Sequence, residues 1–211
     1  MANGHKWFAA LYDRMMAGEE KGFLKHVRSH IVNGARGRVL EVGAGTGANF
    51  PYYEASDART VVATEPDPYM LARARQRLTE LNLPIELQRA PAEGLPFADE
   101  SFDTVVSTLV MCTVDDLEEA LREIRRVLKP GGQFRFYEHV RSISSLGAFF
   151  QDVATPAWSW LGAGCHPNRD VAAAIEGAGF QLREFRRQYP IPNIPPLSVS
   201  RPHIMGVALP N

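Results

Sequence analysis

Val39-Leu40-Glu41-Val42-Gly43-Ala44-Gly45-Thr46-Gly47-Ala48-Asn49-Phe50 is the stretch of sequence that determines the fold. A short apolar run ends abruptly in alternating glycines, and a helix-compatible segment, residues 46–54, follows. This order predicts a strand over 38–42, a tight turn and the N-terminus of a short helix. Glycine permits positive φ and close approach of a ligand to the backbone, and the free N–H groups of a helix N-terminus attract a polar or anionic group. We therefore expect a cofactor-binding loop.

Two acidic residues narrow the class of cofactor. Glu41 stands two residues before the first glycine, and a second apolar run, residues 60–64, ends in Glu65 about one β-α-β unit further on. An acidic residue at the end of the second strand can accept both hydroxyls of a ribose. The glycines alone leave a plain structural turn open, but loop and acid together favour a nucleoside-containing cofactor.

Composition and charge exclude several classes of protein. The 211 residues suffice for one well-buried domain, and a net charge of -1 with 45% hydrophobic residues is typical of a globular protein without a nucleic-acid partner. The two cysteines, Cys112 and Cys165, lie far apart and form no CxxC pair, so neither a disulfide framework nor a metal site is expected. The chain has no apolar run of membrane-spanning length and no signal-peptide pattern, which favours the cytoplasm.

Alternating strands and helices are expected along the rest of the chain. Two helices, divided near Gly18 and Gly22, are predicted over 5–31, and others from Pro68 onward, over 115–129 and over 168–178. Strands are predicted over 60–64, 85–87, 102–107, 133–140, 180–188 and 204–209. This order predicts an α/β fold with a doubly wound, seven-stranded, mostly parallel Rossmann-like sheet and an antiparallel last strand. Ligands bind such sheets at the carboxyl ends of the strands, where four residues should converge: Gly43, Glu65, Thr108 and His139.

The helix over 115–129 has the clearest signals at its two ends. Asp115 and Glu118 fit a capping box, Lys129 suits the C-terminal dipole, and Pro130-Gly131-Gly132 should end the helix.

Three motifs resemble class I S-adenosylmethionine-dependent methyltransferases: Glu41 to Gly47, the acidic Glu65, and Leu128-Lys129-Pro130-Gly131-Gly132 before the fifth strand. The resemblance covers residues 38–140 and implies S-adenosylmethionine as the cofactor. Pro91 stands where many of these enzymes have an acidic residue beside the adenine, so the two residues after it should replace that contact. The implied cofactor residues are Glu41, Gly43, Ala44, Gly45, Gly47, Asn49, Glu65, Pro66, Ala92, Glu93, Thr108 and Leu109.

A narrower resemblance runs almost from end to end. The segments 47–50, 107–112, 137–140 and 201–206, together with Gly164-Cys165, look like the methyltransferase-like proteins that methylate alkyl thiols. This implies methyl transfer to a small apolar thiol. The chain departs from those proteins in lacking their N-terminal membrane-anchoring segment, which implies a soluble enzyme with no integral membrane segment.

The candidate acceptor-side residues are histidines, aromatic residues and one cysteine. His139, at the end of the fifth strand, is the first candidate base, and His203 is the second. Tyr12, Trp158 and Cys165 are candidates for substrate contact. Four aromatic residues could wall an apolar pocket or complete the core, and core packing is the safer expectation for two of them: Phe149, Phe150, Trp158 and Trp160.

The expected single methyltransferase domain has three parts. Residues 1–36 form a helical lid or a helix pair packed on the sheet edge, 37–140 the cofactor-binding core, and 141–211 the substrate-side helices and closing strands. Other functions stay open: methylation of a quinone, a lipid amine or another small acceptor, a nicotinamide-linked reductase, and a non-catalytic cofactor-binding protein.

Overall fold

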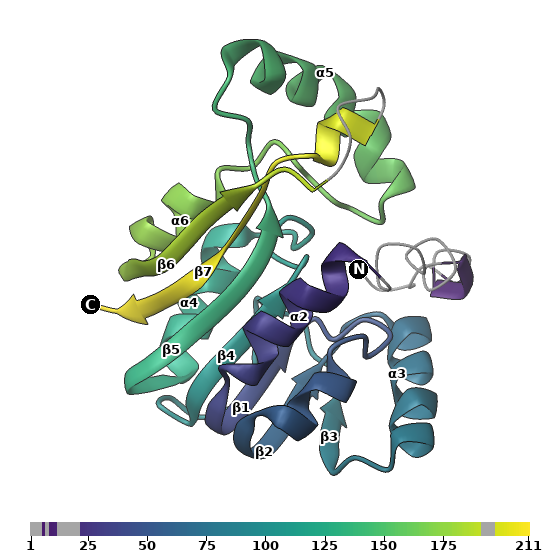
Figure 1. The fold of residues 1–211 in the computed structure, drawn as a ribbon, viewed down its shortest axis with the longest axis vertical. Coiled ribbons are helices and arrows are strands. Elements are labelled where there is room, and N and C mark those ends of the chain that lie inside the picture. The colour runs from purple at the N-terminus through teal and green to yellow at the C-terminus, as the bar shows by residue number, and fades with distance from the viewer. Residues whose placement is uncertain (1–5, 7–8, 12–21, 191–196) are drawn as a thin grey trace.

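One seven-stranded sheet in the order β3-β2-β1-β4-β5-β7-β6 forms the centre of the computed structural model, which describes residues 6, 9–11, 22–190 and 197–211 (Figure 1). The strands are β1 (Arg36–Val42), β2 (Asp57–Thr64), β3 (Ile85–Gln88), β4 (Phe102–Thr108), β5 (Leu128–His139), β6 (Phe180–Gln188) and β7 (His203–Pro210). Strands β1 to β5 pair in parallel, whereas β7 runs antiparallel to both β5 and β6. The predicted doubly wound sheet with an antiparallel last strand is confirmed.

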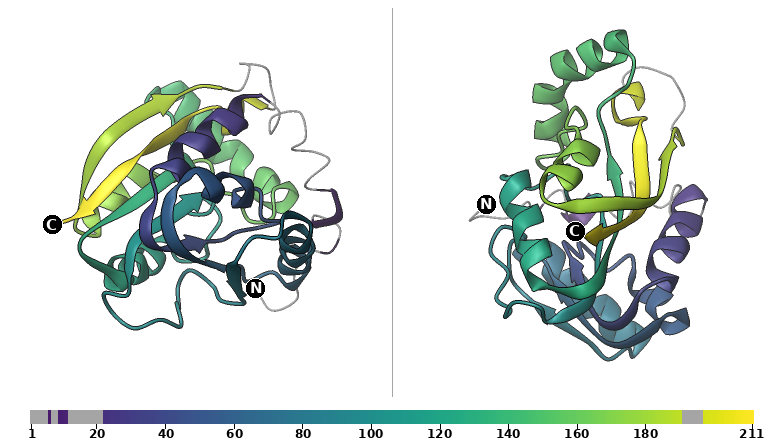
Figure 2. Two further views of the ribbon diagram at one scale, coloured as in Figure 1. Left: turned by 60° about the horizontal axis from the view of Figure 1, so that its bottom comes forward. Right: turned by 90° about the vertical axis from the view of Figure 1, so that its left-hand side faces the viewer.

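Helices cover both faces of this sheet. On one face lie α2 (Phe23–Asn33), the 3₁₀ helix η1 (Phe50–Ala55) and α3 (Pro68–Leu81), and on the other lie α4 (Leu117–Val127) and α6 (Val171–Gly177). Figure 2 shows α2 and the pair α4 and α6 on opposite sides of the strands. The two buried clusters follow from this arrangement, since Leu24, Val27 and Ile31 face the sheet from α2, and Leu121 and Ile124 face it from α4.

The helix predicted to follow the glycine loop directly, over 46–54, is wrong. Residues 46–49 form turns, and the 3₁₀ helix η1 begins only at Phe50. Gly45 and Gly47 have φ values of 58° and 79°, which an α-helix does not accept, and Pro51 then suits the first turn of a new helix.

The cap predicted for α4 is wrong by one residue. The Asp116 carboxylate accepts the Glu119 N–H, so Asp116 is the N-cap, while the Asp115 N–H donates to the Glu93 carboxylate. At the other end the helix stops at Val127 instead of Lys129. The Lys129 ammonium pairs with Asp103 of β4, because the chain has already turned into β5.

The N-terminal prediction is confirmed only for its second helix. α2 packs on the sheet where a helix was expected, and Gly22 precedes its first residue. Most of the first predicted helix, including Tyr12, lies outside the described residues, so the suggested lid stays a prediction.

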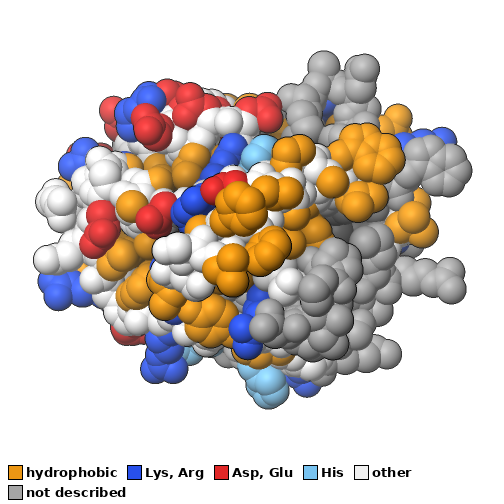
Figure 3. Space-filling view, turned by 90° about the horizontal axis from the view of Figure 1, so that it is seen from above, with side chains coloured by type: hydrophobic (Ala, Val, Ile, Leu, Met, Phe, Trp, Pro, Cys, Tyr) orange, Lys and Arg blue, Asp and Glu red, His pale blue; other side chains and the backbone are white. Residues whose placement is uncertain are grey.

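Helix α5 (Ser145–Leu161) lies beyond the carboxyl ends of the strands and exposes most of its large apolar side chains (Figures 1 and 3). The expectation that two of its four aromatic residues complete the core is wrong, because Phe149, Phe150 and Trp160 are 59%, 58% and 84% exposed. The helix faces the protein with smaller or polar residues, Ala148, Gln151 and Thr155. None of the helices in the described ranges has the length and hydropathy needed to span a membrane.

Candidate functional site

The glycine loop after β1 is shaped by three positive φ values, 65° at Gly43, 58° at Gly45 and 79° at Gly47. A Cβ at Gly43 would collide with Val110, and one at Gly47 with Phe50. A Cβ at Gly45 would meet no atom within 4 Å, so this is the glycine of the loop that borders open space. A cofactor can therefore approach the backbone at Gly45.

Three backbone N–H groups of the loop already have partners within the protein. The Ala44 N–H donates to the Thr64 carbonyl, the Gly45 N–H to the Glu65 carboxylate, and the Gly47 N–H back to the Ala44 carbonyl. These three hydrogen bonds hold the turn, so their N–H groups are not available to a ligand.

Glu65, at the end of β2, is held from two sides. Its Oε2 accepts the Gly45 N–H at 2.8 Å, and its Oε1 accepts the Asp67 N–H at 2.9 Å. Burial raises the pKa of Glu65 to about 7, against these two hydrogen bonds, which lower it. Each carboxylate oxygen has a second lone pair, so Glu65 retains the capacity to accept two hydroxyl donors.

Glu41 is a buried carboxylate with an unpartnered oxygen. Its Oε1 accepts the Asn49 side-chain N–H at 3.1 Å, but its Oε2 has no hydrogen-bond partner among the described residues. The Tyr53 hydroxyl lies near this carboxylate without a well-aligned hydrogen bond. Burial raises the pKa of Glu41 to about 7. A buried oxygen of this kind fits a ligand that brings a polar or cationic donor.

Asn49 and Thr108, both expected to touch the cofactor, belong to a buried hydrogen-bond network around Glu41. The Asn49 amide donates to the Thr108 hydroxyl as well as to Glu41, and its Oδ1 accepts from the Arg28 guanidinium at 2.8 Å. This buried network joins α2, the start of η1, β1 and β4. The burial of Arg28 was not predicted, because a basic residue on an amphipathic helix is usually solvated.

The backbone turns sharply where β4 ends. Leu109 has a φ of 61°, which is rare for a bulky residue, and its N–H donates to the Tyr137 carbonyl at 2.7 Å. Strain of this kind concentrates at functional sites. It directs the chain away from the sheet, into the segment that carries Cys112.

The residues expected beside the adenine are partly committed elsewhere. Glu93 Oε1 accepts the N–H groups of Asp115 and Asp116, ahead of α4. Ala92 is buried in the core, and the Pro66 carbonyl accepts from the Arg89 side chain. A contact from residues 92–93 would therefore come from the backbone more readily than from the Glu93 carboxylate.

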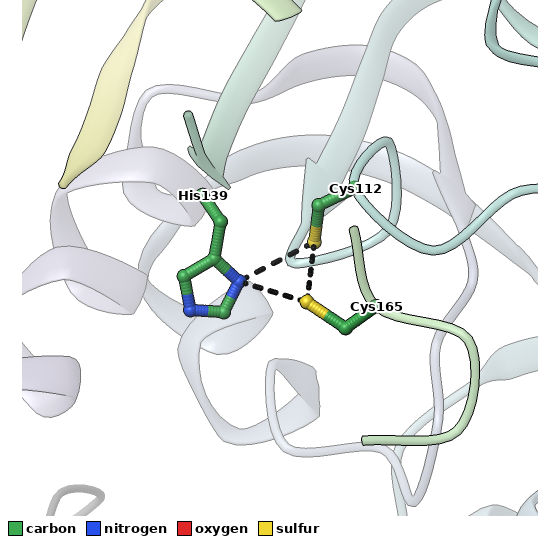
Figure 4. A group of neighbouring side chains, drawn as sticks. All are labelled: Cys112, His139 and Cys165. Carbon is green, nitrogen blue, oxygen red and sulfur yellow. Dashed lines mark hydrogen bonds between the residues drawn. The ribbon is translucent and has the colours of Figure 1, made fainter. Parts of the chain in front are cut away.

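Three side chains lie close together near the carboxyl ends of β4 and β5, as Figure 4 shows. His139 ends β5, Cys112 lies in the segment after β4, and Cys165 follows α5. The His139 Nδ1 lies 3.4 Å from each sulfur, and the two sulfurs are 3.7 Å apart. Sequence reasoning selected His139 and Cys165 separately. It missed Cys112 as a partner, although the motif 107–112 had marked that segment.

The environment makes the two thiols unequal. The Cys112 hydrogen bond is the main cause that lowers the pKa of Cys165 to about 4, and His139 and Trp158 act in the same direction. The same pairing, together with burial, raises the pKa of Cys112 well above its usual value. The surroundings therefore favour ionisation of Cys165 over that of Cys112. Half-buried Trp158 adjoins Cys165.

The His203 ring stacks on Tyr137 and is tilted against His139. Its ring centroid is 4.9 Å from that of Tyr137, at an interplanar angle of 10°, and 4.4 Å from that of His139. Its Nδ1 donates to the Arg201 carbonyl at 3.0 Å, since a carbonyl can only accept. Burial lowers the pKa of His203 to about 3. It is thus neutral near pH 7 and a weak proton acceptor.

Buried hydrogen bonds hold the segments that carry the two cysteines. The Glu138 carboxylate accepts from the Ser107 hydroxyl at 2.5 Å and from the Val110 N–H at 3.1 Å, which ties the segment after β4 to β5. Arg169 donates to the carbonyls of Met111 and Val114, and the His166 N–H donates to the Cys112 carbonyl at 2.6 Å. The sequence predicted no role for Glu138, although the motif 137–140 had marked that segment.

The chain is similar to known methyltransferases along most of its length. The family model of the methyltransferase domain matches residues 40–136. Human thiol S-methyltransferase TMT1A is 35% identical over 208 residues, covering 96% of this chain and 82% of the relative, and human TMT1B is 35% identical over 93% and 80%. A phosphatidylethanolamine N-methyltransferase of Cereibacter sphaeroides is 37% identical over 62% and 64%. The fold resembles an S-adenosylmethionine-dependent methyltransferase of Mesorhizobium loti, with a TM-score of 0.63 at 22% identity, covering 92% and 99%.

Proposed function

Because the chain belongs to the family of S-adenosylmethionine-dependent methyltransferases that contains human TMT1A and TMT1B, we propose that it methylates the sulfur of small, apolar thiols. One observation carries the proposal. The general domain model ends at residue 136, whereas the similarity to the thiol enzymes covers 96% of the chain. It therefore includes the elements after β5 that contribute Cys165 and His203 to the acceptor side.

The cofactor half of the site fits S-adenosylmethionine. When bound, this cofactor supplies a methyl carbon on a positively charged sulfur. We assign Glu65 to its ribose hydroxyls. We assign Glu41 Oε2 to its ammonium group, because this buried oxygen has no hydrogen-bond partner among the described residues. The open space at Gly45 supports close approach there. Around it we assign supporting contacts to the remaining predicted residues, among them Gly43, Ala44 and Gly47.

The acceptor half suits a thiol better than an amine or a phenol. A thiol has a pKa of about 8.5 and is partly ionised near neutral pH, so it needs positioning more than a strong base. We assign His139 as the first side chain that orients the acceptor sulfur and His203 as the second. His203 is neutral and weakly basic, which agrees with an enzyme that does not depend on a strong base. Cys165 and Trp158 line the same side.

Acceptors with one ring and different nucleophiles test the proposal. We would incubate the protein and S-adenosylmethionine with benzenethiol, phenol or aniline, and detect each methylated product by mass spectrometry. We expect methyl phenyl sulfide alone, and faster turnover of 1-octanethiol than of the charged thiol glutathione. Methylation of phenol or aniline without any thiol product would refute the thiol assignment and leave only the methyltransferase activity.

A further inference from the structure

The spacing of Cys112, His139 and Cys165 matches that of metal ligands. The two sulfurs lie 3.7 Å apart, and the imidazole Nδ1 lies 3.4 Å from each of them. A tetrahedral zinc ion, with Zn–S near 2.3 Å and Zn–N near 2.1 Å, holds two sulfurs about 3.8 Å apart and a nitrogen about 3.6 Å from each sulfur. A disulfide would need the sulfurs at about 2.05 Å. The triangle therefore has the size of one face of a zinc tetrahedron.

We propose that Cys112, His139 and Cys165 bind one zinc ion, and that its fourth position binds the acceptor as a thiolate. Within the described part of the chain these three residues form the group of ligand-type side chains close enough for one ion. Three protein ligands and an open position are typical of catalytic zinc, whereas structural zinc has four protein ligands. This inference rests on the proposed thiol acceptor.

The three ligands come from distant parts of the chain, and hydrogen bonds hold the segments that carry the two cysteines. His139 ends β5, next to the Glu138 carboxylate that holds the Cys112 segment. The Cys112 carbonyl accepts the His166 N–H, so the two cysteine-bearing segments are joined beside the sulfurs. These are also the two cysteines of the whole sequence. A ligand triangle that is held in this way needs little rearrangement to bind an ion.

Zinc at this place would activate the acceptor directly. On binding, the acceptor thiol gives its proton to solvent and becomes a zinc-bound thiolate. A lone pair of its sulfur forms the new S–CH3 bond, while the bond from the methyl carbon to the sulfonium sulfur breaks and its electron pair stays on the leaving sulfur. No atom is oxidised or reduced. The thioether product is neutral, a weaker ligand than a thiolate, and can leave. His139 then acts as a ligand instead of a proton acceptor.

Cobalt substitution tests the metal site separately from turnover. Cobalt bound by thiolates has a charge-transfer absorption, and Cys112 and Cys165 are the only cysteines, so in a buffer with a phosphine reductant the band reports on them alone. We expect one cobalt per chain, and at least about 100-fold weaker binding in Cys112→Ser, Cys165→Ser and His139→Ala. His26→Ala, at an exposed position of α2, is the control and should bind as the wild type does.

The open position is tested by adding benzenethiol to the cobalt protein. A third thiolate should strengthen and shift the charge-transfer band, and His26→Ala should respond in the same way. X-ray absorption of the zinc-loaded wild type, which needs no variant that must fold, should show two sulfurs and one nitrogen, then three sulfurs with the thiol. An unchanged band and spectrum would refute the binding of the acceptor at the metal.

The two proposals fail in different ways. Wild type that binds no metal overturns the zinc site. Wild type that methylates benzenethiol at full rate after chelation with verified loss of metal overturns the role of the fourth position. Both results leave the proposed function intact. Stoichiometric metal binding that needs all three ligands, in a protein that methylates no thiol, upholds the ligand set and overturns both the thiol acceptor and the role of the fourth position.

Discussion

At the scale of single residues, Gly45 is the position where we expect a substitution to disrupt cofactor binding most. Asp at this position would occupy the open space beside the loop and bring a negative charge near Glu65. We expect Gly45→Asp to abolish S-adenosylmethionine binding in calorimetry. Gly131→Asp is a matched control, because Gly131 also has positive φ and open space but lies at the start of β5. Both variants should lose about 1–3 kcal/mol of stability, and normal binding by Gly45→Asp would contradict the site.

Glu65 should contribute to affinity through the ribose. Charge-assisted hydrogen bonds are worth about 1.5–3 kcal/mol each at most, with the usual non-additivity, so Glu65→Ala should weaken cofactor binding by at least about tenfold. A 2′-deoxyribose analogue provides the control, since removal of the hydroxyl should cost the wild type more than the variant. If removal of the hydroxyl weakens binding by the same factor in both proteins, Glu65 serves another purpose.

Glu41 should make stability depend on pH. Its pKa is raised from 4.5 to about 7, so the folded protein binds the proton more tightly than the unfolded chain does. The corresponding stability is fully present below pH 4.5 and is lost as pH rises through about 7, and it amounts to about 3 kcal/mol at most. Arg28 from α2 and Glu65 from the end of β2 act on the same group in opposite directions.

Glu41→Gln should therefore stabilise the cofactor-free protein by about 1–3 kcal/mol at pH 8 and by almost nothing at pH 4.5. Denaturant unfolding at the two pH values measures this difference. The same variant should bind S-adenosylmethionine more weakly, because an amide replaces the carboxylate beside the ammonium. A stability gain that is equal at both pH values would contradict the raised pKa.

At the scale of elements, the two ends of α4 separate what the sequence could predict from what it could not. The apolar stripe predicted the helix, but two adjacent aspartates offered two caps. The choice depended on Glu93, 22 residues earlier in sequence than Asp115, whose carboxylate takes the Asp115 N–H. Local pattern does not contain such a contact.

Asp115 and Asp116 should contribute differently to the stability of the protein. Asp116→Ala removes the side chain that accepts the Glu119 N–H and should cost about 1 kcal/mol of stability. Asp115→Ala, at an equally exposed neighbouring position, should cost no more than about 0.5 kcal/mol. Thermal unfolding of both variants measures the two losses of stability. A larger loss in Asp115→Ala than in Asp116→Ala would show that Asp115 is the N-cap.

The cofactor elements were easier to predict than the acceptor elements, for a physical reason. The glycine loop and Glu65 belong to one β-α-β unit, so neighbours in sequence are neighbours in space. Cys112, His139 and Cys165 come from three separate segments, at intervals much longer than the spacing of a sequence-local metal motif. Only the fold brings them together, which is why the sequence argued against a metal.

At the scale of the whole molecule, the alternation of strands and helices was sufficient to predict the sheet and its antiparallel last strand. The exposure of α5 was not predictable, since a run rich in Phe, Leu and Trp has the same pattern inside a core and on a surface. Burial there is decided by Gln151, whose amide donates to the carbonyls of Val140, Pro167 and Val199 and so turns the polar side of the helix inward.

The position of β7 between β5 and β6 has a consequence for synthesis on the ribosome. β6 pairs with β7 alone, and β7 is the later of the two to be translated. A nascent chain that has just released β6 therefore carries a strand with no partner and a β5 with one open edge. Unpaired edges of this kind invite association with other chains. For this protein, the interval between translation of residues 188 and 210 is when a chaperone has most to protect.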